Sequence, residues 1–241
     1  RIILKRELEK LKKIHPEDLA EHLEQATIRN VLKSLRVMDK DTSARIIADL
    51  NLDYQKEILG QYSPGHAGQI LSLIDPAESV DALLVLDKEK RGEILPHIEK
   101  TKRKQIEFLL RHAKTPIGHL MTTDYFAVSA NLLLQTVLEK MKNETGNFSE
   151  LLYVYAVNEE NQIVGVLTLH ELVLQKSDIP IYKVMDQNLV LSRLTTPKEI
   201  VLQRMLKYHM YAMPIVDENR NLLGIVNLQD IAEDTMKGKG K

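Results

Sequence analysis

The side chains in this sequence that can do chemistry are mainly carboxylates and imidazoles. The chain has 34 Asp and Glu residues and eight His residues, and it contains no Cys. Disulfides and thiolate metal sites are therefore excluded, which fits a reducing compartment. His15 and His22 share a helical face at seven-residue spacing. No HExxH motif or acidic third ligand accompanies them, so we expect a solvated helix face rather than a metal site.

The sequence lacks the signatures of several other function classes. It has no Gly-rich phosphate loop, no GxSxG elbow and no matched Ser/His/Asp motif, which indicates that the protein is not an enzyme. The formal net charge is −1, so no basic field favours nucleic acid as a partner. No run of about 18 apolar residues occurs, so this chain contains no transmembrane segment. With 241 residues, it is long enough for about two domains.

Short amphipathic blocks fill residues 15–112 and predict an all-α domain. One block is HPEDLAEHLE, and others begin at Pro64 and Pro76, which suit the first position of a helix. In DTSARIIADL, Asp41, Thr42 or Ser43 is expected to cap the helix. Blocks of this length with short polar breaks predict a right-angled bundle or a short solenoid. Because proline disfavours helix in the residue before it, Thr115-Pro116 places the domain boundary near 113–117.

The second half contains an internal duplication. IVGVLTLHEL (163–172) and LLGIVNLQDI (222–231) are offset by 59 residues, whereas IGHLM and IYKVM, ending at Met121 and Met185, are offset by 64. The difference falls on NETGNFS, an extra loop in the first copy. Each copy has a helix, a hairpin and a further helix that we expect to start at Glu171 or Asp230. The sequence thus predicts two β-α-β-β-α units that bury their sheets in common about a pseudo-twofold axis.

These repeats resemble a pair of CBS domains through the ending G-[IV]-[VL]-[TN]-x-x-[DE]-[IL]. A helical domain that runs through TPIGHLMTTDYFAV into such a pair resembles the cytosolic portion of the MgtE family of magnesium transporters and channels. The resemblance implies an α+β chain with a helical domain at 1–115, a first CBS domain at 116–179, and a second CBS domain with its tail at 180–241. It also implies a homodimer at the cytoplasmic face of the cell membrane. The partner that the resemblance implies is a membrane-embedded transporter portion of the same or another chain.

The resemblance further implies a Mg²⁺-sensing function. In this family, carboxylates between the helical and CBS domains bind Mg²⁺, which favours a compact dimer that closes the pore. Mg²⁺ is a hard ion that prefers a few carboxylates and carbonyls, although the physiological ion can also be another divalent cation. Asp81 and Asp230 match acidic positions of the family, and the backbone at Gly118-His119 matches a carbonyl donor. The full set of implied metal ligands is Asp49, Glu78, Asp81, His119, Asp230 and Glu233.

The CBS resemblance also leaves an alternative open, a module that responds to ATP or AMP and regulates another transporter or an enzyme. CBS clefts commonly bind adenine nucleotides, with the Asp of T-x-x-D on the ribose. Here the equivalent segments are Thr168–Glu171 and Asn227–Asp230, and His170 stands where a basic residue often binds phosphate. The implied nucleotide-binding residues are Tyr153, Thr168, Glu171, Val190, Met210, Pro214, Asn227 and Asp230. A third hypothesis is a purely structural dimerisation scaffold.

Overall fold

The structure is a computed structural model, and it describes residues 16–143 and 152–238. The chain divides into two compact units between Arg111 and His112, and we describe each by itself. Within the described ranges, none of the helices has both the length and the hydrophobicity needed to cross a lipid bilayer. His15 and the predicted extra loop beyond Asn143 lie outside the described residues.

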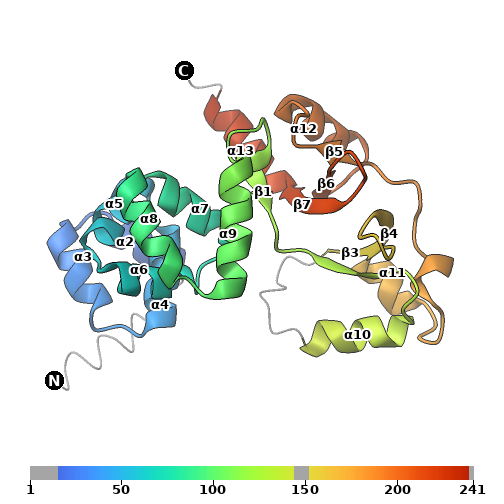
Figure 1. Cartoon of the computed structure of the whole chain (residues 1–241), viewed down its shortest axis with the longest axis horizontal. Coiled ribbons are helices and arrows are strands. Elements are labelled where there is room, and N and C mark those ends of the chain that lie inside the picture. Colours follow the sequence, from blue (N-terminus) through green and yellow to red (C-terminus); the bar gives the residue numbers. More distant parts are fainter. Residues whose placement is uncertain (1–15, 144–151, 239–241) are drawn as a thin grey trace. The chain divides into compact units, whose positions relative to one another are not determined.

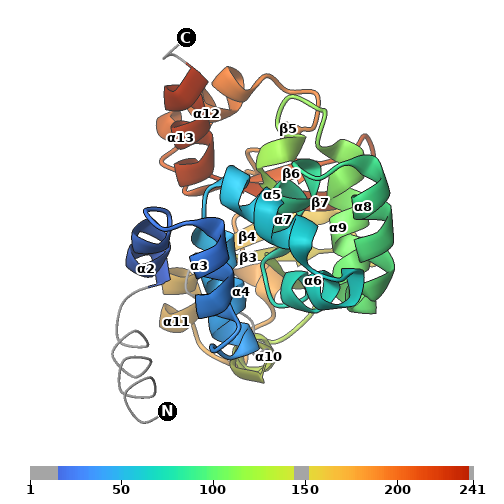
Figure 2. The same cartoon turned by 90° about the vertical axis from the view of Figure 1, so that its left-hand side faces the viewer.

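The first unit is built from short helices, as predicted. They are α2 (Pro16–Leu23), α3 (Ile28–Leu35), α4 (Lys40–Asp49), α5 (Leu52–Gln61), α6 (Pro64–Leu71), α7 (Pro76–Leu84), α8 (Lys88–Ile94), the 3₁₀ turn η1 (Leu95–His97) and α9 (Lys100–His112). In Figure 2 they follow one another from α2 and α3 at one end of this unit to α8 and α9 at the other. Their buried faces carry Leu, Ile and Val side chains such as Ile46, Ile58 and Leu83, each at most 2% exposed.

The helix starts of this unit recur with a constant spacing of twelve residues. The side chains of Asp39, Asn51, Ser63, Asp75 and Asp87 each accept a hydrogen bond from a backbone N–H of the helix that follows. Such caps satisfy N–H groups that a helix cannot pair within itself. The prediction that Asp41, Thr42 or Ser43 caps α4 is wrong. The helix starts earlier because Asp39 accepts from the backbone N–H of Thr42 at 2.9 Å.

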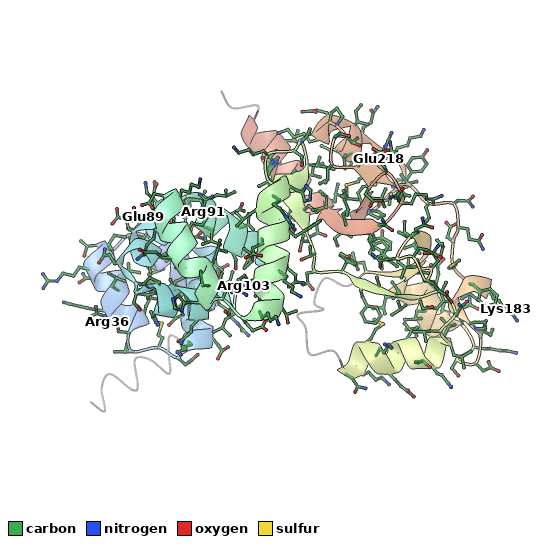
Figure 3. All side chains as sticks on the ribbon, viewed as in Figure 1. Arg36, Glu89, Arg91, Arg103, Lys183 and Glu218 are labelled. Carbon is green, nitrogen blue, oxygen red and sulfur yellow. The ribbon has the colours of Figure 1, made fainter. Side chains whose placement is uncertain are left out.

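Basic side chains pair with the carbonyls at several helix ends. Arg91 of α8 donates to the carbonyls of Leu83 at 3.0 Å and Leu86 at 3.1 Å, at the end of α7 (Figure 3). A cation at a helix C-terminus is favourable because the last carbonyls lack partners and carry partial negative charge. Arg91 thus ties two successive helices together.

The second unit consists of two β-α-β-β-α repeats with short lead-in segments. The first has η2 (Gly118–Leu120), β1 (Met121–Thr122), β2 (Phe126–Ser129), α10 (Leu134–Asn143), β3 (Tyr153–Val157), β4 (Ile163–Thr168) and α11 (Leu169–Leu174). The second has η4 (Ile181–Lys183), β5 (Ser192–Arg193), α12 (Lys198–Lys207), β6 (Ala212–Val216), β7 (Leu222–Asn227) and α13 (Leu228–Gly238). Figure 1 shows α10 and α11 beside the first hairpin and α12 and α13 beside the second. Helices α11 and α13 begin two residues before the predicted starts, Glu171 and Asp230.

The predicted duplication is present in the strand register. Tyr153 pairs with Thr168 in the first hairpin, and Ala212 pairs with Asn227 in the second, with the same offset of 59 residues at both positions. The two turns also meet: Ile163 N–H donates to Arg220 O at 3.1 Å, and Leu222 N–H donates to Asn161 O at 3.4 Å. These are equivalent bonds seen from the two repeats, which is the signature of a pseudo-twofold axis.

The two repeats share a core, as predicted, but they also exchange their lead-in segments. Buried residues of both hairpins, including Tyr155, Ile163, Val216 and Ile225, form one cluster. The strand order of one sheet is β1-β7-β6-β5, so β1 of the first repeat joins the sheet of the second. Asp186, before β5, bridges in return to Val166 of β4. The exchange was not predicted from the sequence.

Candidate functional site

Glu78 occupies a distinctive place in the helical unit, the third residue after the cap Asp75. At the equivalent position of three other repeats, a Tyr or Lys side chain donates a hydrogen bond to the backbone carbonyl of the residue 28 positions earlier. The pairs are Tyr54 with Ala26 at 2.8 Å, Lys90 with Tyr62 at 3.1 Å, and Lys102 with Ile74. Two of these three donors are ammonium groups. Glu78 has a carboxylate where these repeats have a donor, so the ionised side chain cannot make the equivalent hydrogen bond.

The surroundings of Glu78 raise its pKa from 4.5 to about 7. The largest cause is desolvation by the protein atoms packed around the carboxyl group, even though part of the side chain reaches water. The negative charges of Asp75, Asp49 and Asp81 raise the pKa further. Both effects disfavour the ionised form. Four carboxyl groups from α4, α7 and the cap before α7 therefore interact electrostatically.

This group contains three residues of the implied metal set, Asp49, Glu78 and Asp81. Within the described part of the chain, no three His, Asp or Glu side chains are placed closely enough to hold a metal ion as a cluster. Mg²⁺ does not need such a cage, because it keeps several waters and is usually held by one or two carboxylates. The hard oxygen donors therefore fit a weakly held, hydrated divalent cation. Asp75 was not predicted, although its spacing from Glu78 places it one helical turn away.

Asp49 also faces a second group of carboxylates. It lines a pocket of about 370 Å³ together with Asp18, Glu21 and Glu24. Glu24 accepts a hydrogen bond from the backbone N–H of Asn51 at 2.6 Å, which fixes one side of this pocket. Asp49 ends α4, where the helix carries partial negative charge, so its carboxylate lies in a region of negative potential.

In the second unit, His119 lies close to Asp234, a residue that was not predicted from the sequence. His119 Nε2 lies 3.7 Å from Asp234 Oδ1, and Lys198 Nζ lies 2.6 Å from Asp234 Oδ2. Hydrogen bonding to Lys198, followed by the charges of Lys198 and His119, holds the pKa of Asp234 below its usual value of 3.8. The signal for Asp234 was its position four residues after Asp230 in LQDIAED.

Asp230 and Glu233 lie on α13 and make hydrogen bonds within that segment. Asn227 Nδ2 donates to Asp230 Oδ2 at 3.2 Å, and Gln229 Nε2 donates to Glu233 Oε1 at 3.2 Å. Both carboxylates are exposed. The six implied metal ligands are thus divided equally between the two units.

The nucleotide-binding residues implied in the first repeat lie close together, but they form hydrogen bonds with one another. Tyr153 and Thr168 are cross-strand partners in the β3–β4 hairpin. Thr168 and Glu171 form a capping box, in which Thr168 N–H donates to Glu171 Oε2 at 2.8 Å and Glu171 N–H donates to Thr168 Oγ1 at 3.1 Å. The carboxylate of Glu171, which the resemblance expects to bind a ribose, therefore stabilises the start of α11.

The implied residues of the second repeat are more dispersed. Tyr153 Oη accepts from the backbone N–H of Tyr211 at 3.2 Å, which links the first hairpin to the segment that contains Met210. Pro214 is buried within β6, and Asn227 pairs with Ala212 at the end of β7. Val190 lines a separate groove, whose other lining residues were not predicted.

The chain matches two protein families. It matches the MgtE intracellular N domain over residues 14–115 and the CBS domain over residues 117–178 and 181–236. It is 30% identical to the magnesium transporter MgtE of Enterococcus faecalis over 129 residues, and 30% identical to that of Thermus thermophilus over 131 residues. Each match covers 54% of this chain but only 28% and 29% of these relatives. The matched part thus spans less than a third of their length.

Solved structures show the same fold. One is described as the cytosolic domain of the Mg²⁺ channel MgtE in complex with ATP, with 26% identity, a TM-score of 0.86, and coverage of 94% of this chain and 92% of that one. Another is the soluble part of a magnesium transporter, with 23% identity, a TM-score of 0.86, and coverage of 95% and 90%. The predicted α+β fold class and the predicted resemblance are confirmed. The chain therefore consists of an MgtE intracellular N domain followed by a pair of CBS domains.

Proposed function

We propose that this chain is the Mg²⁺-sensing regulatory part of a magnesium transporter or channel, acting at the cytoplasmic face of a membrane. The observation that carries the proposal is the group around Glu78. Its carboxyl group, with a pKa raised to about 7, stands at a place where Lys90 and Lys102 put ammonium groups in later repeats. A bound divalent cation would supply the positive charge that this repeat lacks. The family match supports magnesium as the ion.

The switch would use repulsion among carboxylates. The helical unit contributes Asp49, Glu78 and Asp81. The CBS pair contributes His119, Asp230 and Glu233. Like charges repel until a cation reduces their repulsion, and Mg²⁺ held by carboxylates of both units would therefore favour a compact state. Without the ion, the two units would separate more readily, and this change would be passed to the pore of the same or another chain. No step of this scheme requires catalysis by the chain.

We propose that the working form is a homodimer joined through CBS helices. Large apolar side chains on these helices face solvent: Val173 and Leu174 of α11 are 65% and 68% exposed, and Leu206 of α12 is 58% exposed. Large apolar side chains that are exposed in one copy are candidates for burial in an association surface. A second copy is the natural partner, because pseudo-twofold repeats offer similar helical faces on both sides of the module.

A second candidate function is the sensing of adenine nucleotides by the CBS pair. It is favoured by the solved cytosolic domain that is described as a complex with ATP, which is 26% identical to this chain. The carboxylates around Glu78 belong to the helical unit, so the implied Mg²⁺ and nucleotide residues have only Asp230 in common.

Thermal unfolding during a Mg²⁺ titration tests the first proposal, with NaCl added to keep ionic strength constant. We expect stabilisation with a midpoint at about millimolar Mg²⁺, because few carboxylates hold the ion. Asp81→Asn should weaken this stabilisation. Asp53→Asn, which removes an exposed carboxylate from the first turn of α5, should leave it unchanged. No stabilisation of the unaltered chain by Mg²⁺ would contradict the proposal.

A further inference from the structure

Helix α9 has a concentration of positive charge at its start. Four of the five residues from Lys100 to Lys104 are Lys or Arg, and the first turn contains no acidic residue. By contrast, α4, α5, α7 and α8 each have an acidic residue in the first turn. The N-terminal end of a helix carries partial positive charge, so cations at this end oppose the stability of the helix. Helix stability therefore does not explain why the cations gather there, and a local rule that a sequence breaks often marks a functional site.

Two of the four cations at the start of α9 have partners within the helical unit. The ammonium group of Lys102 donates to the backbone carbonyl of Ile74. Arg103, labelled on α9 in Figure 3, has its Nε 4.0 Å from Glu107 Oε1, and its Nη1 donates to Pro96 O at 3.4 Å. The packing of the helical unit thus accounts for these two residues.

The other cations of α9 are Lys100, Lys104 and Arg111, which we call the α9 stripe. Their spacing of four and seven residues places them on one side of the helix. All three residues are exposed, and within the described part of the chain none of their side chains forms a hydrogen bond or an ion pair. The opposite side of the helix carries the buried residues Ile106 and Leu109. The α9 stripe is therefore a line of free positive charge that the fold itself does not use.

An anionic lipid surface fits the α9 stripe better than a protein or a nucleic acid does. On α9 the carboxylate that shares this side is Glu107, which already lies beside Arg103. Protein interfaces have an apolar centre, but Phe108 and Leu110 of this helix are only partly exposed. Single-stranded nucleic acids stack on exposed aromatic rings, which the stripe lacks. A bilayer with anionic lipids presents negative charge along the whole stripe, which is about 16 Å long.

We propose that the α9 stripe docks the helical unit on an anionic lipid surface. This inference rests on the proposed function, which places the chain at the cytoplasmic face of a membrane, and it adds a lipid partner for the regulatory part. Each Lys or Arg near such a surface strengthens binding about fivefold, so three cations give a weak attachment. Because the charges stay in water, salt screens the attachment. A weak and reversible contact suits a unit whose movement is the signal.

Cosedimentation of the full chain with lipid vesicles tests the α9 stripe. Vesicles of phosphatidylcholine with about 30% phosphatidylglycerol are compared with vesicles of phosphatidylcholine alone, without Mg²⁺ and at low ionic strength. We expect binding to the anionic vesicles only, and release at about 0.5 M NaCl. Lys100→Gln combined with Lys104→Gln should weaken this binding about 20-fold to 30-fold.

Lys176→Gln combined with Lys183→Gln is the matched control. It removes the same charge from two exposed lysines of the second unit, and it should bind the vesicles as the unaltered chain does. Gln and Lys have similar helix propensities, and removing cations from the start of α9 relieves an unfavourable interaction. The variant with Lys100→Gln and Lys104→Gln should therefore unfold at no lower temperature than the unaltered chain, which separates lost binding from a lost fold.

Three results would contradict lipid docking: no binding to the anionic vesicles, equal binding to both kinds of vesicle, or the same loss in both double variants. If the chain binds polyglutamate but not the anionic vesicles, the stripe takes an acidic protein and lipid docking is wrong. Stabilisation by Mg²⁺ is measured separately, in thermal unfolding without lipid. Failure of vesicle binding therefore leaves Mg²⁺ sensing standing, and failure of Mg²⁺ stabilisation contradicts sensing alone.

Discussion

Met121 packs against the bare backbone of Gly224, with its Cγ 2.6 Å from the position that a Cβ atom would take on that glycine. Met185 stands in the same relation to Gly165 in the other repeat. Each methionine belongs to the lead-in segment of one repeat, and each glycine lies in the hairpin of the other. The two glycines are therefore the positions that allow the lead-in segments to be exchanged.

The exchange predicts that Gly224→Ala destabilises the CBS pair. The added methyl group would collide with Met121 and also with the backbone oxygen of Thr122, 2.6 Å from the Cβ position. Because a backbone atom cannot move as easily as a side chain, we expect a loss of about 2–3 kcal/mol in the free energy of unfolding. Urea unfolding followed by circular dichroism measures it.

Gly60→Ala is the control for this substitution. Gly60 lies in α5, and nothing stands within 4 Å of its Cβ position. Since alanine favours helix, this variant should be more stable by about 0.5–1 kcal/mol. A Gly224→Ala variant as stable as the unaltered chain would show that the lead-in strand does not pack as described.

The exchange also marks the limit of what the sequence could reveal. The offsets of 59 and 64 residues identified the two repeats, because matching motifs require only local patterns. They could not say which sheet β1 joins, since strand pairing between distant segments depends on the three-dimensional arrangement. Predicted helix starts lie up to about four residues from the observed ones, because caps such as Asp39 compete with nearby polar residues.

Some features of the candidate sites could be predicted from the sequence, and others could not. Asp49, Glu78 and Asp81 were chosen by resemblance, and the structure shows that the other two carboxylates raise the pKa of Glu78. Part of the rise in the pKa of Glu78 comes from Asp49, which lies in α4, so the residue spacing within α7 could not predict it. Arg204 and Lys207 lie three residues apart on α12, and no pattern in the sequence singled them out. Only the approach of residues 189–191 turns this part of α12 into one wall of a groove.

Arg91→Met should destabilise the helical unit. The substitution keeps much of the side-chain length but removes the hydrogen bonds to Leu83 and Leu86. Because these carbonyls at the end of α7 would lose a charged partner, we expect a loss of about 1–3 kcal/mol. Lys88→Met, an exposed change on the same helix, is the control and should shift stability by less than about 0.5 kcal/mol. Equal effects of the two variants in urea unfolding would argue against the helix-end role.

The raised pKa of Glu78 predicts a pH-dependent effect of Glu78→Gln. Between about pH 4.5 and pH 7, the folded chain keeps a proton that the unfolded chain releases. The contribution of Glu78 to stability is therefore present at low pH and is lost as the pH rises through this window. At pH 8 the variant should be more stable by about 0.5–1 kcal/mol, allowing for solvent screening, and at pH 4 the difference should vanish. A constant difference at all pH values would contradict the assignment.

Glu78→Lys tests the comparison with the later repeats. The introduced ammonium group should take the role that Lys90 and Lys102 play in their repeats, and it should stabilise the chain when Mg²⁺ is absent. Since the positive charge is then built in, added Mg²⁺ should stabilise this variant much less than the unaltered chain. Thermal unfolding with and without Mg²⁺ checks both effects. Undiminished stabilisation by Mg²⁺ would place the ion elsewhere.

Asp234→Asn should weaken the link between η2, α12 and α13. The pKa of Asp234 is lowered by Lys198 and His119, so its contribution to stability is present above about pH 4 and is lost as the pH falls below that value. Because Asp234 is partly exposed, we expect a loss of no more than about 1 kcal/mol at pH 7. Comparing the unfolding of the two proteins at pH 7 and pH 3 measures it, and a loss that persists unchanged at pH 3 would mean that charge is not the cause.

Small-angle X-ray scattering of the purified chain, with and without about 10 mM Mg²⁺ at constant ionic strength, tests the central claim most directly. The concentration suits a site with few carboxylate ligands. The Mg²⁺-sensing account predicts a smaller radius of gyration with Mg²⁺, and a weaker change in Asp81→Asn and in Asp230→Asn. A radius that stays the same at every Mg²⁺ concentration, while the oligomeric state is unchanged, would contradict the account.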